Sequence, residues 1–311
     1  MKSAIPKALA AKVARVARRL RKAPRLVLKE AIERYLRTGS CDPSGAPWPG
    51  NVIERSRRAH DELIQALVTE VTRRAKARPA PELAPGFDGV AFTRAKVEPM
   101  VCGLFPRVER QVVLAMLERA VVFLTPANLE LVLRHQRWLG TAWDLANLYL
   151  GSIGAEPLGE AAPAIVGLSE ETTCFISMQY FSESDPFADF LVHEVAHVFH
   201  NCKRETVGLP ATRRREWLLD IDYRKRETFA YACEAYARIL GRARNLAGRA
   251  ALAREYGGDG RFSEARVDPA EVADILREAG PRRNGWKVIL ARCAPPARSP
   301  ARAGRTEVVE A

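Results

Sequence analysis

Apolar residues recur every three to four positions along most of this chain, which is the spacing of an amphipathic helix. The clearest case lies between Asn51, a residue type that caps helices, and Arg78. Its apolar stripe is formed by Ile53, Leu63, Ile64, Leu67 and Val71. The same spacing predicts helices over residues 108–120, 126–139, 141–150 and 224–240. A further helix should begin at Asp268-Pro269 and end at Gly280.

β-Branched and aromatic runs predict a small antiparallel sheet, with a hairpin over residues 164–168 and 172–181 and a short strand at 121–124. The helix after the hairpin should begin at Ser184-Asp185-Pro186 and end near Cys202. Residues 187–200 of that helix, FADFLVHEVAHVFH, leave almost no polar face, so we expect it to be buried. These elements predict a mostly helical α+β fold with the sheet beside this helix.

Proline-rich and turn-forming stretches divide the chain into five segments. The predicted segments are a basic arm of two helices (5–22 and 25–37) within residues 1–40, a linker and helix (41–89), a main domain (90–240), a helical extension (241–294) and a disordered tail (295–311).

The net charge of +12 is concentrated at the N-terminus. Residues 1–40 contain twelve Lys or Arg and two Glu, a net charge of +10, which leaves +2 for the other 271 residues. Such an arm would attract phosphates in a salt-sensitive way, so nucleic acid is a candidate partner; a solvated helix face is the alternative. Tyr35 is the only aromatic residue within residues 1–40, which argues against binding of single-stranded nucleic acid by base stacking.

The sequence has no membrane span and no secretory signal, so a cytoplasmic location is expected. Its six cysteines are scattered, without a CxxC pair, which is typical neither of a zinc ribbon nor of a disulfide framework. Any metal ion should therefore be bound by histidine and carboxylate side chains.

The buried helix carries the motif His193-Glu194-Val195-Ala196-His197. Four-residue spacing puts both imidazoles on one face, where they can share a metal ion. Glu194 lies about 100° around the helix, within reach of a metal-activated water. Burying three polar side chains is costly unless something satisfies them, and zinc would do so. The alternative is a pair of core histidines bonded to neighbouring carbonyls.

The motif resembles that of the HExxH zincins. The metzincin pattern HExxHxxGxxH fails, because His200 stands at its glycine and Lys203 at its last histidine. The gluzincin-like pattern fits better, since Glu227-Thr228-Phe229-Ala230 matches its ExxA ligand helix thirty residues after His197. The chain is similar over residues 170–240 to the small intracellular HExxH peptidases of mobile elements, including those that cleave repressors.

This resemblance implies that His193, His197 and Glu227 bind one zinc ion per chain and that Glu194 is the general base. Glu234 competes with Glu227, because seven residues put both on the same helix face; one could ligate zinc while the other anchors a ligand histidine. Tyr231 is the candidate donor to a developing oxyanion.

Several other residues near the motif have alternatives that stay open. Tyr236 is a second candidate oxyanion donor, although packing is as ordinary a role for either tyrosine. His200 could support a ligand or simply pack. The remaining candidates are Asp220 and Asp222 as ligands of an aspartate-type zincin, and Cys202 and Cys233 as core residues.

The expected function is zinc-dependent hydrolysis of a peptide bond in a protein or peptide substrate. One alternative is a nucleic-acid-binding regulator with a structural or vestigial zinc site. Another is a zinc-dependent amidase acting on a non-peptide substrate, because activated water attacks many carbonyls.

Overall fold

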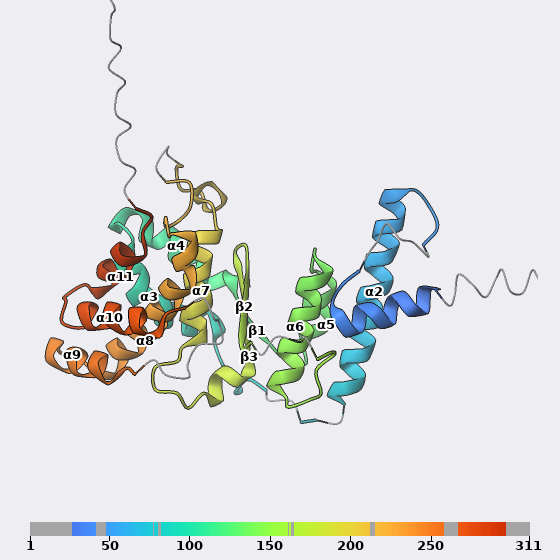
Figure 1. Ribbon diagram of the computed structural model, residues 1–311, viewed down its shortest axis with the longest axis horizontal. Helices are drawn as coiled ribbons and strands as arrows, with labels where there is room; N and C mark the ends of the chain where they lie inside the picture. Colours follow the sequence, from blue (N-terminus) through green and yellow to red (C-terminus); the bar gives the residue numbers. More distant parts are fainter. Residues whose placement is uncertain are drawn as a thin grey trace, which may run out of the picture. The chain divides into compact units, whose positions relative to one another are not determined.

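The computed structural model describes residues 27–41, 48–76, 78–79, 82–160, 162, 165–211, 215–257 and 267–296. Within these ranges the chain is mostly helical with one small sheet, an α+β arrangement (Figure 1). The predicted helix at 5–22 and the tail beyond residue 296 lie outside the described residues. No helix in the described ranges is long and apolar enough to cross a membrane.

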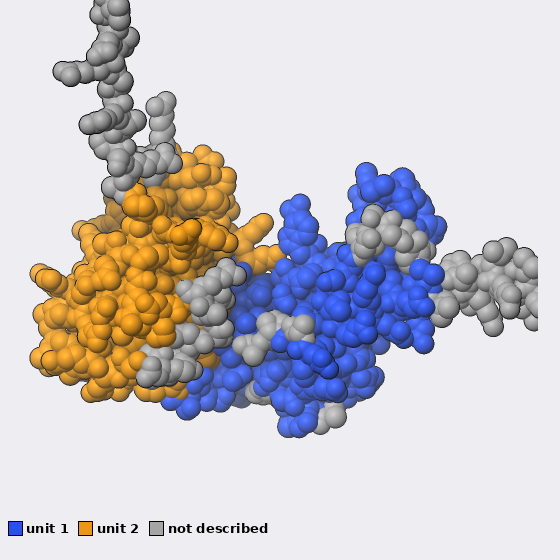
Figure 2. All heavy atoms as spheres, in the orientation of Figure 1, with its two compact units in different colours: residues 1–90, 121–169, 173–184 blue, residues 91–120, 170–172, 185–311 orange. Residues whose placement is uncertain are grey.

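The chain divides into two compact units that are interleaved along the sequence (Figure 2). Unit 1 comprises residues 1–90, 121–169 and 173–184; unit 2 comprises 91–120, 170–172 and 185–311. Along the sequence, the chain leaves unit 1 after Val90, returns to it at Val121, and returns again at Thr173.

The helices of unit 1 are residues 27–38, α2 (Val52–Ala75), α5 (Leu129–Arg134) and α6 (Leu139–Ser152). The predicted cap of α2 is confirmed: the Asn51 side chain accepts a hydrogen bond from the backbone N–H of Glu54, whose own side chain accepts from Asn51 N–H. Leu63, Leu67 and their neighbours are buried against α5 and α6. The prediction for Ile53 is wrong, because burial in α2 begins only at Ala59 and Ile53 is 66% exposed.

The second half of the predicted basic arm is packed into unit 1. Tyr35 is fully buried, and its hydroxyl donates a 2.8 Å hydrogen bond to Leu139 O. Trp143 Nε1 in turn donates to Leu36 O at 2.8 Å. Trp48, at the end of the predicted linker, is also buried and donates to Glu62 Oε2 at 3.0 Å. Tyr35 is therefore a core residue and is not available to stack on a ligand.

The sheet contains β1 (Val121–Leu124), β2 (Gly167–Glu170) and β3 (Thr173–Ser177), in the order β1-β3-β2. The expectation of an antiparallel sheet is wrong in part: β2 and β3 form the predicted hairpin, but β1 pairs with β3 in parallel, so the sheet is mixed. The parallel pairing is possible because α5 and α6 provide the long crossover that it needs. β3 ends earlier than predicted, because residues Met178–Ser182 form the 3₁₀ helix η1.

Most of the described residues of unit 2 lie in helices. Its helices are α3 (Gly89–Leu104, apart from its first two residues), α4 (Arg107–Ala120), α7 (Phe190–Asn201), α8 (Arg226–Arg242), α9 (Leu246–Glu255), α10 (Pro269–Ala279) and α11 (Gly285–Cys293), with short 3₁₀ helices η2 (Arg204–Val207) and η3 (Tyr223–Lys225). The predicted bounds of α10 are confirmed, since the Asp268 side chain caps its start and Gly280 follows its end. α8 is the central helix, packed against α7, α9, α10 and α11.

Candidate metal centre

The helix that carries the histidine motif begins four residues after the predicted Pro186. Asp185 does not cap it; its side chain accepts a 2.8 Å hydrogen bond from Phe187 N–H in the turn before the helix. The cap of α7 is instead Asp189, whose side chain accepts from Val192 N–H at 3.4 Å and from Lys96 Nζ at 2.8 Å. Asp189 is only 2% exposed, so the lysine on α3 compensates a buried negative charge.

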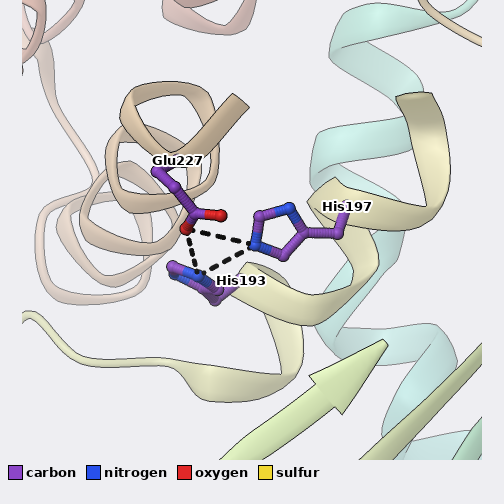
Figure 3. Close-up of side chains that lie close together, drawn as sticks. All are labelled: His193, His197 and Glu227. Carbon is purple, nitrogen blue, oxygen red and sulfur yellow. Dashed lines mark hydrogen bonds and ion pairs between the residues drawn. The ribbon is translucent and has the colours of Figure 1, made fainter. Parts of the chain in front are cut away.

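Two helices bring the predicted metal ligands together (Figure 3). His193 and His197 point from α7 toward Glu227, which lies in the first turn of α8. The Nε2 atoms of the two histidines are 3.2 Å apart, and Glu227 Oε2 lies 3.6 Å from His193 Nε2 and 3.4 Å from His197 Nε2. Among the residues the structure describes, these three form the one group with the arrangement of a metal site.

The separations of these atoms fit a small cation. Metal–nitrogen and metal–oxygen bonds of about 2.0–2.1 Å at tetrahedral angles put ligand atoms about 3.3 Å apart. The three measured separations lie close to this value. Two imidazoles and one carboxylate suit zinc, as they suit other first-row metals, and three protein ligands leave a coordination position for water or substrate.

The second nitrogen of His193 is held by Glu234 on α8. Its Nδ1 lies 3.0 Å from Glu234 Oε2, while Glu234 Oε1 accepts a 2.8 Å hydrogen bond from Asp189 N–H. Glu234 is 5% exposed and lies on the Nδ1 side of His193, whereas Glu227 faces the Nε2 atoms of both histidines. Of the two roles that the sequence left open, the structure places Glu227 at the cluster and Glu234 as the anchor of His193.

The second nitrogen of His197 is held within α7 itself. His197 Nδ1 lies 3.1 Å from His200 Nε2, and His200 Nδ1 lies 3.0 Å from Asn201 Oδ1. His200 is 3% exposed, and burial, reinforced by His197 and Arg226, lowers its pKa to about 3. His200 is therefore a neutral contact of a predicted ligand, the less ordinary of the two roles considered for it.

The charges at the cluster reinforce one another. Burial acts to raise the pKa of Glu227, but hydrogen bonds with His193 and His197 outweigh it and hold the pKa well below its usual range. Burial likewise acts to lower the pKa of His193, yet Glu227, Glu234 and the charge of Glu194 raise it well above its usual value. A site that concentrates negative charge around two imidazoles in this way favours a cation.

The two predicted catalytic residues flank His193. Glu194 follows it in α7, is 8% exposed, and contributes its negative charge to the environment of His193. Tyr231 lies one turn after Glu227 in α8, and its ring meets the His193 ring edge-on, with centroids 4.6 Å apart. Both residues therefore lie next to the cluster.

Other predicted candidates lie elsewhere. Tyr236 is a core residue: its ring packs against Trp286 and its hydroxyl accepts a 3.1 Å hydrogen bond from Gly285 N–H, so it is not the oxyanion donor considered for it. Asp222 caps η3, where its side chain accepts a hydrogen bond from Arg224 N–H. Among the described residues, the cluster that could hold a metal ion includes neither Asp222 nor Asp220. Cys202 and Cys233 are buried free thiols, as core packing predicts.

Comparison with family models, with curated proteins and with solved structures gave no match.

Sequence reasoning missed Asp189 and Lys96. Asp189 precedes a continuous apolar run and is of a capping type, which is a usable signal. It was masked by the stronger Ser-Asp-Pro signal at 184–186. The pairing with Lys96, 93 residues away in sequence, has no local signal at all.

Proposed function

We propose that this protein is a zinc-dependent hydrolase of peptide bonds, in which His193, His197 and Glu227 hold one zinc ion per chain. The observation that carries the proposal is the convergence of their three ligand atoms, at 3.2, 3.4 and 3.6 Å from one another. The second nitrogen of each imidazole is engaged by Glu234 or His200, which leaves both Nε2 atoms for a metal. Core histidines satisfied by carbonyls would not show this arrangement.

The proposal includes the gluzincin-like assignment. Ala230, the last residue of the ExxA pattern, is completely buried on α8, the helix that packs against α7. A small apolar side chain suits this completely buried position.

A zinc ion held by His193, His197 and Glu227 would supply a Lewis acid that acidifies water and polarises a substrate carbonyl. Glu194 accepts a proton from the water as its oxygen attacks the carbonyl carbon. As the C–N bond breaks, Glu194 returns that proton to the amine nitrogen. Tyr231, beside His193, donates a hydrogen bond to the oxyanion that forms on the carbonyl oxygen.

The test compares wild-type protein with Glu194→Gln, and uses Glu205→Gln, an exposed residue of η2, as the matched control. Metal content is measured by mass spectrometry and hydrolysis with unfolded protein substrates. We expect about one zinc ion in all three proteins, and a loss of about 10²–10⁴-fold in hydrolysis by Glu194→Gln alone.

Four outcomes would contradict parts of this proposal. A fully active Glu194→Gln variant would remove Glu194 from the mechanism. Wild-type protein that takes up no zinc after reconstitution would reduce the motif to core histidines. Cleavage of small amides with no cleavage of unfolded proteins would replace the peptidase by an amidase. A zinc-loaded protein that hydrolyses neither, but binds nucleic acid with a steep salt dependence, would favour the regulator.

A further inference from the structure

We propose that His200 is a positioning residue for the metal ligand His197 and sets the metal affinity of the site. This inference rests on the proposed metal site, but not on the reaction it performs. His200 lies one helical turn after His197 in α7, and the two imidazoles are joined by the 3.1 Å contact between His197 Nδ1 and His200 Nε2.

The hydrogen bonds fix the tautomer of each ring. His197 Nε2 faces Glu227 Oε2 and His193 Nε2, so a metal at the cluster requires a lone pair on this nitrogen. The proton of neutral His197 is then on Nδ1 and is donated to His200 Nε2. His200 must therefore carry its own proton on Nδ1, where Asn201 Oδ1 accepts it at 3.0 Å. Each N–H group in this series of hydrogen bonds therefore has an acceptor.

The hydrogen bonds that join His197, His200 and Asn201 are partly buried, which raises the cost of breaking them. His200 is 3% exposed, and a buried imidazole with an unpaired nitrogen would cost free energy. Here both nitrogens are paired, and both pairs lie within α7, so the orientation of the His197 ring is set without a metal ion. Pre-orientation of this kind lowers the entropy lost on binding.

The two ligand histidines are supported differently, which explains why a histidine suits position 200. His193 donates to a carboxylate, Glu234. Glu227 and Glu194 already add two further carboxylates at the site. A carboxylate at position 200 would add a fourth beside the same cluster, whereas a neutral imidazole provides the acceptor without the charge.

The test replaces the acceptor while retaining the volume. His200→Phe fills the same space with no acceptor, and His200→Gln restores an amide oxygen near the position of Nε2. The control is His60→Phe, which removes a half-buried histidine from α2 in unit 1. Zinc affinity is measured by competition with a chromogenic chelator, and the folding of each metal-free protein by circular dichroism and thermal unfolding.

We expect His200→Phe to bind zinc about 10–100-fold more weakly than wild type, His200→Gln to recover most of that loss, and His60→Phe to match wild type. Equal affinities of His200→Phe and wild type would overturn the positioning role and leave the metal site intact. Equal weakening by Phe and Gln would also overturn it, because loss of packing would then explain the effect. Wild-type protein that binds no zinc would overturn this inference together with the proposed function.

A misfolded His200→Phe variant would not end the test. Asn201→Leu then takes its place, because it removes the acceptor that holds the His200 proton on Nδ1. Zinc binding weakened by Asn201→Leu and retained by His200→Gln supports the inference, and unchanged binding by Asn201→Leu contradicts it.

Discussion

Glu234 and His193 lie on different helices, and a 3.0 Å hydrogen bond joins Glu234 Oε2 to the Nδ1 of the histidine. The other oxygen of the same carboxylate accepts the backbone N–H of Asp189, the residue that caps α7. One side chain of α8 thus contacts both the start of α7 and the imidazole of His193.

Replacing Glu234 should therefore weaken metal binding without removing it. We expect Glu234→Gln to retain the zinc stoichiometry with an affinity about 10–100-fold lower, because the amide does not stabilise the His193 Nδ1 proton as a carboxylate does. Glu234→Ala should in addition lose about 1–3 kcal/mol of unfolding free energy, since the buried Asp189 N–H loses this acceptor. Chelator competition and urea unfolding measure the two effects. Unchanged zinc affinity in both variants would contradict the anchoring role.

Zinc should stabilise the folded protein through Glu227. A ligand that binds only the native state at a free concentration about 100 times its Kd adds about 2.7 kcal/mol to the unfolding free energy. We expect thermal unfolding to shift upward on addition of zinc, and EDTA to reverse the shift. Glu227→Ala should show no shift, because the carboxylate is one of the three converging ligands. A full shift in Glu227→Ala would move the third-ligand role to another residue.

The Asp189–Lys96 ion pair should contribute to the stability of unit 2 independently of metal. Asp189→Ala removes both the helix cap and the acceptor of Lys96 Nζ, at a cost of about 2–4 kcal/mol in unfolding free energy. Asp189→Asn keeps a capping oxygen and should recover about 1 kcal/mol of that cost. Denaturant unfolding of the metal-free proteins checks both. Equal stabilities of the Ala and Asn variants would show that the cap contributes nothing.

The cysteines should differ sharply in reactivity. Burial raises the pKa of Cys293 to about 12 and that of Cys233 well above its usual value, and the thiolate is the reactive form. Because burial raises the pKa of these thiols in the folded state, they ionise first in the unfolded state as the pH rises. Their contribution to the free energy of unfolding therefore falls as the pH rises above the ordinary thiol pKa. In native protein at pH 8 we expect iodoacetamide to label the half-buried Cys41 and Cys102 before these two. Peptide mass spectrometry identifies the order, and early labelling of Cys233 would contradict it.

The parts of the site that could be predicted are those encoded by local spacing. His193 and His197 share a helix face because they are four residues apart, and Glu227 and Glu234 share another because they are seven apart. Spacing could not decide which glutamate meets the Nε2 atoms and which meets Nδ1. That choice depends on how α8 lies against α7, which is a matter of packing.

In the fold, too, elements with local sequence signals were predictable, whereas features set by tertiary contacts were not. Helices with a clear cap and stripe, such as α2 and α10, appear with bounds close to those expected. The parallel pairing of β1 with β3 was not foreseen, because each strand is short and its partner is set by tertiary contacts. The end of β3 was also missed, since its apolar residues continue into η1 without a break in pattern.

The interleaving of the two units limits how the protein can be divided by genetic engineering. The three converging side chains all lie within residues 193–227, so a fragment beginning at Asp185 would contain them. Such a fragment lacks Lys96, whose ammonium group neutralises the cap of α7, because α3 is encoded between two stretches of unit 1. The cluster of His193, His197 and Glu227 therefore cannot be transferred to another protein as this fragment alone, and α3 must be supplied with it.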